Sequence, residues 1–526
     1  MTHGAFPYFR TKPVETILAE SQHKEGGLRR VLTAWDLTAL GVGAIIGTGI
    51  FVLTGVAAAT KAGPAIMLSF VFAGFACIFS ALCYAEFAAR LPISGSAYTY
   101  AYATIGELLA WIIGWDLILE YTIGAAAVAV GWSKYFEKFL GGFPALHISQ
   151  SFFTPHLFGF EVNPFAGVII LLITALLAVG IKESSRFNAV IVVVKLAVVL
   201  LVIFAGIPWV RPENWSPFFP FGVNGIFVGA AYIFFAYIGF DAISTTAEET
   251  INPQRDLPIG IIASLLICTV LYVAVAAVLT GMVPYNHIDH GAPLAAAFGA
   301  QGFAGAKILE KVIAFGALAG LTTVLLVLLM SQPRMYYSMA RDGLFFPVFA
   351  KIHPKFGTPF LATIITGCIA AAMACFVPLD ELAELVNIGT IFAFIIVCSS
   401  VLIMRYKSPT NPTRGSLLLL VFVASLLLGG FAFRYQWAPP SLWLSLAVAL
   451  VTAGMIATQK TVNLPETFRC PWVPLLPLLG IACNVYMMIN LDPPTWYRLL
   501  WWLAVGLVVY SFYGIWHSKL RTPSDS

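Results

Sequence analysis

Residues 41–51 read GVGAIIGTGIF, with four glycines inside nine positions of an apolar run that covers residues 36–57. The run is long enough to span a bilayer. A freed backbone group in hydrocarbon is costly unless a partner satisfies it, and a helix facing lipid has no need of so many glycines. We therefore expect an unwound stretch here, followed by a half-helix whose free N–H groups suit a carboxylate. Close helix packing through small residues is the alternative.

A second interrupted run lies five runs further along the chain. Residues 232–246 read YIFFAYIGFDAISTT, in which an aromatic cluster precedes a glycine, an acid and a hydroxyl-rich stretch. Unwound carbonyls there would accept an ammonium group, and the aromatic side chains would shape a dry pocket. Interrupted segments at corresponding places predict an inverted-repeat transporter of five plus five helices.

The rest of the chain fits a membrane protein. Of 526 residues, 60% are apolar and only 10% are charged, too few to cover a water-facing surface, which excludes a soluble enzyme, a disordered protein and a nucleic-acid-binding protein. An all-α polytopic fold is expected, with 14 transmembrane helices. The runs are 36–57, 64–89, 106–133, 164–181, 187–207, 222–246, 258–282, 308–332, 359–377, 383–404, 415–433, 441–458, 473–490 and 497–516.

The distribution of basic residues predicts the orientation. The first 33 residues are polar and basic, and the first apolar run is too long for a cleavable signal peptide. If the N-terminus is cytoplasmic, 20 of the 29 lysines and arginines face the cytoplasm and 8 face outward, with Lys195 inside a run. This asymmetry predicts a multi-pass protein of the plasma or inner membrane with both termini in the cytoplasm.

Metal and catalytic patterns are missing from the sequence. The eight cysteines have no C-x-x-C spacing, and the eight histidines lie in loops or at helix ends without a carboxylate at ligand spacing. We expect no metal, no cofactor and no enzymatic activity.

Several ionisable residues lie at depth. Lys195 is about 12 Å into its run at 1.5 Å per residue. Burial disfavours the ammonium form, so this lysine is a candidate proton carrier, with snorkelling as the alternative. Asp116 and Glu120 share one face of a helix and could favour a cationic group, or could be structural acids. Glu86 and Asp241 are expected to lock helices together.

Several segments resemble the amino acid–polyamine–organocation superfamily and, within it, the cationic amino acid transporter family. The similarity covers about residues 28–407 and 465–518. It is carried by residues 43–51 (GAIIGTGIF), 84–87 (YAEF), 92–98 (PISGSAY), 115–121 (WDLILEY) and 252–258 (NPQRDLP). The resemblance implies the leucine-transporter-type fold.

The resemblance also implies a binding site. The substrate carboxylate would meet the N–H groups of Gly47, Thr48 and Gly49. The amine would meet the carbonyls of Ile45, Ile46, Phe235, Ala236 and Ile238, with Phe235 capping the pocket. Lys195 matches the lysine that replaces sodium in proton-coupled members, with Thr322 and Thr323 nearby. Glu120 matches an acid associated with substrate selection.

The resemblance divides the chain into segments. Residues 1–33 would form a cytoplasmic segment, 34–407 the ten-helix core, 408–462 a two-helix insertion, 463–518 the last two helices and 519–526 a cytoplasmic tail. One departure from the family name concerns the substrate: residues 321–327 read LTTVLLV, and bulky apolar side chains there would favour small neutral amino acids over cationic ones.

We therefore expect a secondary active transporter that imports an amino acid with a proton by alternating access. An exchanger or uniporter of the same fold, or a membrane-embedded amino acid sensor, are alternatives that the residues leave open. A channel would need a continuous polar stripe and a membrane enzyme a clustered His/Asp or Cys/His set, and neither is present. The expected partners are the substrate and membrane lipids; a small membrane-protein partner, the oligomeric state and the direction of transport are not specified by the sequence.

Overall fold

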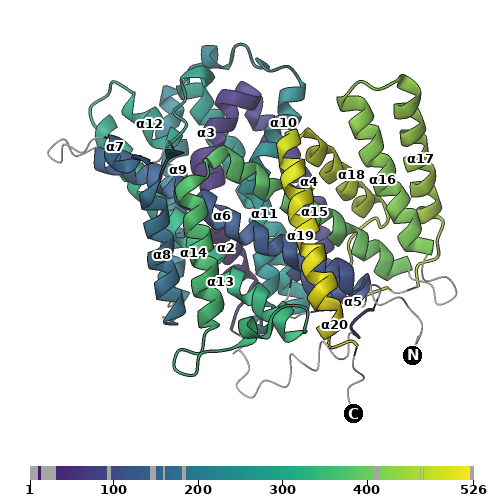
Figure 1. The fold of residues 1–526 in the computed structure, drawn as a ribbon. Helices are drawn as coiled ribbons and strands as arrows, with labels where there is room; N and C mark the ends of the chain where they lie inside the picture. The colour runs from purple at the N-terminus through teal and green to yellow at the C-terminus, as the bar shows by residue number, and fades with distance from the viewer. Residues whose placement is uncertain are drawn as a thin grey trace.

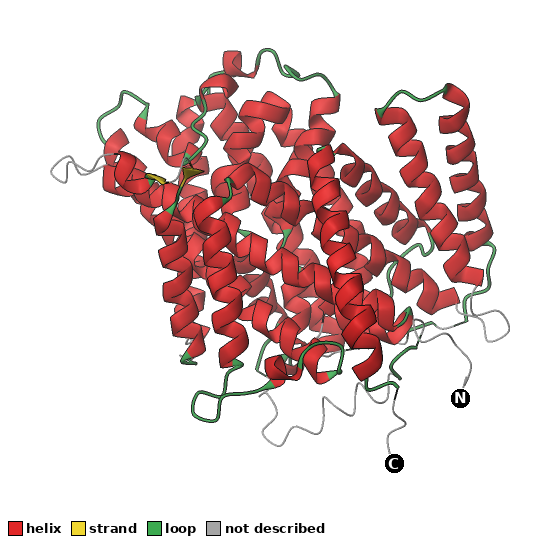
Figure 2. Ribbon diagram, in the orientation of Figure 1, coloured by secondary structure: helices red, strands yellow, loops and turns green. Residues whose placement is uncertain are grey.

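The computed structural model describes residues 10–13, 31–91, 96–141, 150–157, 160–180, 185–406, 414–462, 464–465 and 467–521. Most of the predicted segment 1–33, the boundary at 407–408 and residues 522–526 of the predicted tail lie outside this range. The described chain is helical apart from a short antiparallel pair, β1 (His156–Leu157) with β2 (Phe160–Glu161), so the predicted all-α class is confirmed (Figure 2).

Helices follow one another along the whole described chain. The first half contains α2 (Ala34–Ile45), α3 (Thr54–Ala57), α4 (Ile66–Arg90), α5 (Ser96–Thr104), α6 (Glu107–Gly141), α7 (Gln150–Phe153), α8 (Pro164–Ala178), α9 (Ser185–Gly206), α10 (Asn224–Ile233) and α11 (Pro253–Met282). The second half contains α12 (Pro293–Gly299), α13 (Ala306–Arg341), α14 (Phe360–Phe376), α15 (Leu379–Tyr406), α16 (Arg414–Arg434), α17 (Pro439–Ala457), α18 (Leu475–Asn490), α19 (Pro493–Val509) and α20 (Ile515–His517).

Nine helical stretches of the described chain are long and apolar enough to cross a membrane, and five shorter apolar helices accompany them. Each predicted apolar run overlaps at least one of these helices, and the runs 36–57 and 222–246 are interrupted. Local signals fix several helix starts. Thr33 and Asp36 form a capping box at α2, and Asn163 caps α8, whose first residue is Pro164.

The long helices α6 and α13 pack along each other, and α2 and α4 both pack on α11. The pair α16–α17, which corresponds to the predicted insertion, lies at one edge of the molecule and contacts α18 (Figure 1). The described residues nearest the two chain ends meet on one face: Lys12 Nζ lies 2.9 Å from Asp342 Oδ1, and the Lys519 N–H donates to the Asp342 carbonyl at 3.1 Å.

Candidate functional site

The first predicted interruption is present in the structure. Helix α2 ends at Ile45, and Ile46 is extended with φ −71° and ψ 100°. The chain becomes helical again in η2 (Gly49–Leu53), a π-helical segment. Residues 46–49, up to the first residue of η2, are called the first break below. Glycine has a low helix propensity, and this is the glycine cluster on which the prediction was based.

The second predicted interruption is also present. Helix α10 tightens into the 3₁₀ turn η8 (Phe234–Tyr237), Ile238 is extended, and the 3₁₀ segment η9 (Asp241–Glu249) follows. Residues 234–240, from η8 to the start of η9, are called the second break. Gly239 has φ +122°, a conformation that side-chain-bearing residues rarely adopt, and a Cβ there would lie 2.9 Å from the Ala44 carbonyl carbon.

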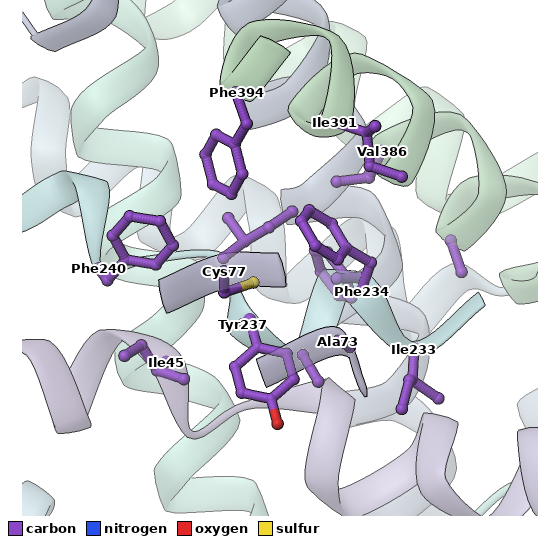
Figure 3. Packing of buried hydrophobic residues seen from close by; sticks show 14 of the residues in the cluster. Ile45, Ala73, Cys77, Ile233, Phe234, Tyr237, Phe240, Val386, Ile391 and Phe394 are labelled. Carbon is purple, nitrogen blue, oxygen red and sulfur yellow. The ribbon is translucent and has the colours of Figure 1, made fainter. Parts of the chain in front are cut away.

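The two breaks touch each other. A Cβ at Gly49 would lie 2.3 Å from the Ala236 Cα, so the backbones meet without room for a side chain. Aromatic side chains of the second break, Phe234 and Phe240, both contact Phe394 of α15, with ring centroids 5.6 Å and 5.1 Å apart. Figure 3 shows this buried cluster together with Ile45 from the end of α2.

A small cavity of about 30 Å³ lies between the breaks, α6 and α13. Six of the nine predicted substrate-binding residues line it, whereas Ile46, Ala236 and Glu120 do not. Its lining comprises Ala44, Ile45, Gly47, Thr48, Gly49, Tyr121, Val128, Phe235, Ile238, Gly239, Asp241, Val324, Val327, Leu328 and Ser331.

Several carbonyls predicted to bind the substrate amine already have a donor. The Tyr272 hydroxyl lies 2.8 Å from the Ile45 carbonyl oxygen and 2.7 Å from that of Ala236. The Phe235 carbonyl accepts the Ile238 N–H at 3.2 Å. This role of Tyr272 was not predicted from the sequence. A tyrosine inside the apolar run 258–282 indicates a buried hydroxyl that needs a hydrogen-bond partner.

Lys195 is fully buried on α9 and reaches the first break. Its Nζ donates to the carbonyl of Gly43, to the carbonyl of Ile46 at 3.2 Å and to Thr323 Oγ1 at 3.1 Å. Of the two threonines predicted to lie near Lys195, Thr323 contacts its Nζ and Thr322 does not. Thr322 instead accepts a hydrogen bond from Trp132 Nε1 at 3.0 Å.

The two acids of α6 are buried beside the site and outside its lining. None of the four carboxyl oxygens of Asp116 and Glu120 has a hydrogen-bond partner among the described residues. Asp116 lies against α15, where a Cβ at Gly389 would be 2.9 Å from Oδ1. An ionised carboxylate is costly to bury without donors, so the described surroundings do not stabilise the charged form of either acid.

Of the other two acids, Glu86 joins helices, as expected, and Asp241 accepts a hydrogen bond from a residue two positions before it. Glu86 of α4 accepts Arg405 Nε of α15 at 2.9 Å and NH2 at 2.5 Å, and also the Cys470 N–H at 2.8 Å. Asp241 lines the cavity, and its Oδ1 accepts the Gly239 N–H at 3.2 Å within the second break. Throughout the described part of the chain, no group of three or more His, Cys, Asp or Glu side chains is arranged to hold a metal ion.

Comparison with known proteins gives a consistent picture. The sequence profile of a family described as "Amino acid permease" matches residues 32–510. The chain is 45% identical to the methylthioribose transporter of Bacillus subtilis and 43% identical to its branched-chain amino acid permease BcaP, each over 98% of this chain and 99% of the relative. It is 36% identical to the vacuolar cationic amino acid transporter 4 of Arabidopsis thaliana, over 97% of this chain and 96% of that protein.

Proposed function

Because this chain belongs to the amino acid permease family of the amino acid–polyamine–organocation superfamily, we propose that it is a proton-coupled amino acid symporter. Membership of the family means that the chain transports amino acids or related solutes across a membrane and is not an enzyme. In this proposal fourteen helices cross the plasma or inner membrane with both termini in the cytoplasm. The first ten form the five-plus-five inverted-repeat core, and transport proceeds by alternating access.

Backbone groups at the two breaks hold the substrate in this proposal. The half-helix that begins at Gly49 points its N-terminal end at the cavity, where the positive end of the helix dipole suits the carboxylate. The extended residue Ile238 of the second break lines the opposite side, next to Phe235, and supplies a carbonyl toward the amine. Recognition of these two charged ends leaves the side chain of the substrate to the walls of the cavity.

The walls favour a neutral, apolar substrate side chain. From α6 and α13 they present Val128, Val324, Val327 and Leu328. The one carboxylate of the lining, Asp241, accepts a backbone hydrogen bond, and Glu120 lies outside the lining. The names of the relatives differ in substrate, from methylthioribose to branched-chain and cationic amino acids. The proposed substrates, small neutral or branched aliphatic amino acids, are therefore inferred from the cavity walls alone.

The contacts of Lys195 carry the proposal of proton coupling. An ammonium group has three N–H donors, and three neutral acceptors surround Nζ: the Gly43 carbonyl near the end of α2, the Ile46 carbonyl at the first break and the Thr323 hydroxyl. Loss of the proton removes one donor and the charge, which weakens the attachment of the first break to α9 and α13. A proton gained on one side of the membrane and lost on the other thus becomes linked to movement of the helix that binds the substrate. This observation favours symport over exchange or uniport.

The test uses purified protein in vesicles with an imposed inward proton gradient. Gradient-driven uptake of a neutral amino acid is expected in the wild type and is expected to be lost in Lys195→Met, which retains exchange across the membrane. Thr323→Val should weaken the coupling, whereas Thr322→Val, the matched control that does not contact Lys195, should not. Uptake that ignores the gradient, or that Lys195→Met leaves unchanged, would contradict symport, and a requirement for internal amino acid would identify an exchanger.

A further inference from the structure

One face of α6 borders the cavity, and its middle position has no side chain. Tyr121 and Val128 both line the cavity. Gly124 lies three residues after the first and four before the second, and these spacings place all three on one face of the helix. Gly124 is not itself among the residues that line the cavity, but it lies on the same face of α6, between two positions that do carry side chains.

The space in front of Gly124 lies where two walls of the cavity meet. A Cβ built there would lie 3.5 Å from Leu328 Cδ1 on α13 and 3.6 Å from Phe235 Cε2 at the second break. Both residues line the cavity. These are ordinary van der Waals distances, so a methyl group fits without displacing either neighbour. Close packing does not require a glycine at this position.

At two other glycines near the site, close packing does require the absence of a side chain. Gly131, two turns further along α6, would bring a Cβ to 3.0 Å from Thr48 Cγ2 and 3.2 Å from Val52 Cγ2. Gly49 would bring one to 2.3 Å from the Ala236 backbone. At those positions glycine is explained by helix contact. At Gly124 helix contact does not explain the glycine, and the space between it, Phe235 and Leu328 is the size of a methyl group.

We propose that Gly124 sets the upper limit on the size of the substrate side chain, and that a branched aliphatic side chain uses the space at the Phe235–Leu328 junction. This inference rests on the proposed function, because it assumes an amino acid held by its main-chain groups at the two breaks. With those groups fixed there, the substrate side chain extends toward the wall formed by α6 and α13. A methyl group on residue 124 would narrow the space from the α6 side.

The experiment compares kcat/KM for glycine, alanine, valine and leucine in vesicles containing the wild type or Gly124→Ala. The ratio of leucine to glycine uptake is expected to fall by about tenfold or more, the range that one methylene controls in an apolar pocket. Adding Leu328→Ala to Gly124→Ala should recover leucine uptake, because it restores volume from the opposite wall. The matched control is Gly454→Ala on α17, where a Cβ meets nothing within 4 Å; it should keep the wild-type ratio.

The outcomes separate the two proposals. If the wild type takes up leucine but Gly124→Ala lowers glycine and leucine uptake equally, Gly124 has a role in packing or movement, and the size limit alone is overturned. An unchanged ratio in Gly124→Ala overturns it as well. A wild-type protein that takes up none of the four amino acids overturns the proposed function and this inference together.

Discussion

The hydroxyl oxygen of Tyr272 on α11 lies 2.7 Å from the carbonyl oxygen of Ala236 at the end of the second interrupted helix. The same hydroxyl lies 2.8 Å from the carbonyl of Ile45, the last residue of α2. A hydroxyl has one proton to donate, so the two carbonyls share it. One side chain of α11 thus connects the two helices whose ends form the cavity.

Tyr272→Phe is expected to destabilise the protein. The ring contacts with Phe70 and Tyr237 remain, but two buried carbonyls lose their shared donor, at a cost of about 1–3 kcal/mol. Thermal unfolding in detergent should show a lower Tm, and the KM for substrate should rise. Tyr497→Phe, at an exposed position on α19, is the control and should leave both unchanged. An unaltered Tm in Tyr272→Phe would show that the hydroxyl does not hold the breaks.

Gly49→Ala is expected to abolish transport. The added Cβ would lie 2.3 Å from the Ala236 Cα, and backbone cannot rotate away as a side chain can, so the breaks must separate. Substrate-induced thermal stabilisation should disappear together with uptake. Gly415→Ala on α16, where the nearest atom is Gln459 Oε1 at 3.8 Å, is a matched glycine substitution that should keep both. Substrate binding by Gly49→Ala would contradict the close approach of the two breaks.

Glu86→Gln is expected to be among the most destabilising single substitutions. Removing the charge leaves the Arg405 guanidinium buried without its bidentate partner, which costs about 3–5 kcal/mol. Glu381→Gln removes the partner of Arg498 in a half-exposed pair and should cost less than about 1 kcal/mol. Tm and the yield of folded protein are the measurements. The double variant Glu86→Gln/Arg405→Met should be more stable than Glu86→Gln, and a lack of recovery would show that the charge pair is not the cause.

Asp342→Asn is expected to weaken the contact between residues 10–13 and the end of α13. Asp342 accepts Lys12 Nζ at 2.9 Å and the Tyr98 hydroxyl at 2.8 Å, and all three residues are buried. The neutral amide loses the ion pair with Lys12, which holds residues 10–13 against α5 and α13. Hydrogen exchange at the Lys12 amide, which donates to the Tyr102 carbonyl, should become faster. Lys307→Met, which breaks a pair with Glu310 at the other end of α13, should leave that exchange rate unchanged.

The breaks could be predicted from sequence because a helix interruption is a local property. The glycines at 43, 47 and 49 lower helix propensity where α2 ends, and Gly239 supplies the positive φ of the second break. The apolar runs likewise predicted the helices, since a membrane-crossing helix needs a continuous apolar stretch. Glu86 was correctly expected to hold helices together, because a buried acid in such a run needs a donor. The hydrogen bond of Asp241 with Gly239 is local and does not test the same expectation for Asp241.

Long-range contacts could not be predicted in the same way. Tyr272 and Ile45 are 227 residues apart, and Lys12 and Asp342 are 330 apart, so no spacing in the sequence connects them. Glu120 shows the limit most clearly. Its spacing from Asp116 predicts that both acids share one face of α6, but not which neighbour that face meets, and the structure places Glu120 outside the cavity lining. The proposed role of Gly124 could not be predicted from the sequence, because it depends on the absence of a side chain.

The contact between the start of α6 and residues 510–518 has a consequence for how the protein is made. Glu107, at the start of α6, accepts the Ser518 hydroxyl at 2.5 Å and the Tyr510 hydroxyl at 2.9 Å, and Ser518 lies 411 residues later in the chain. During translation the third run therefore enters the bilayer long before its last two donors are synthesised. A chain that ends before residue 510 leaves the buried Glu107 carboxylate without these two hydroxyl donors. Only the chain that includes residues 510–518 satisfies this carboxylate.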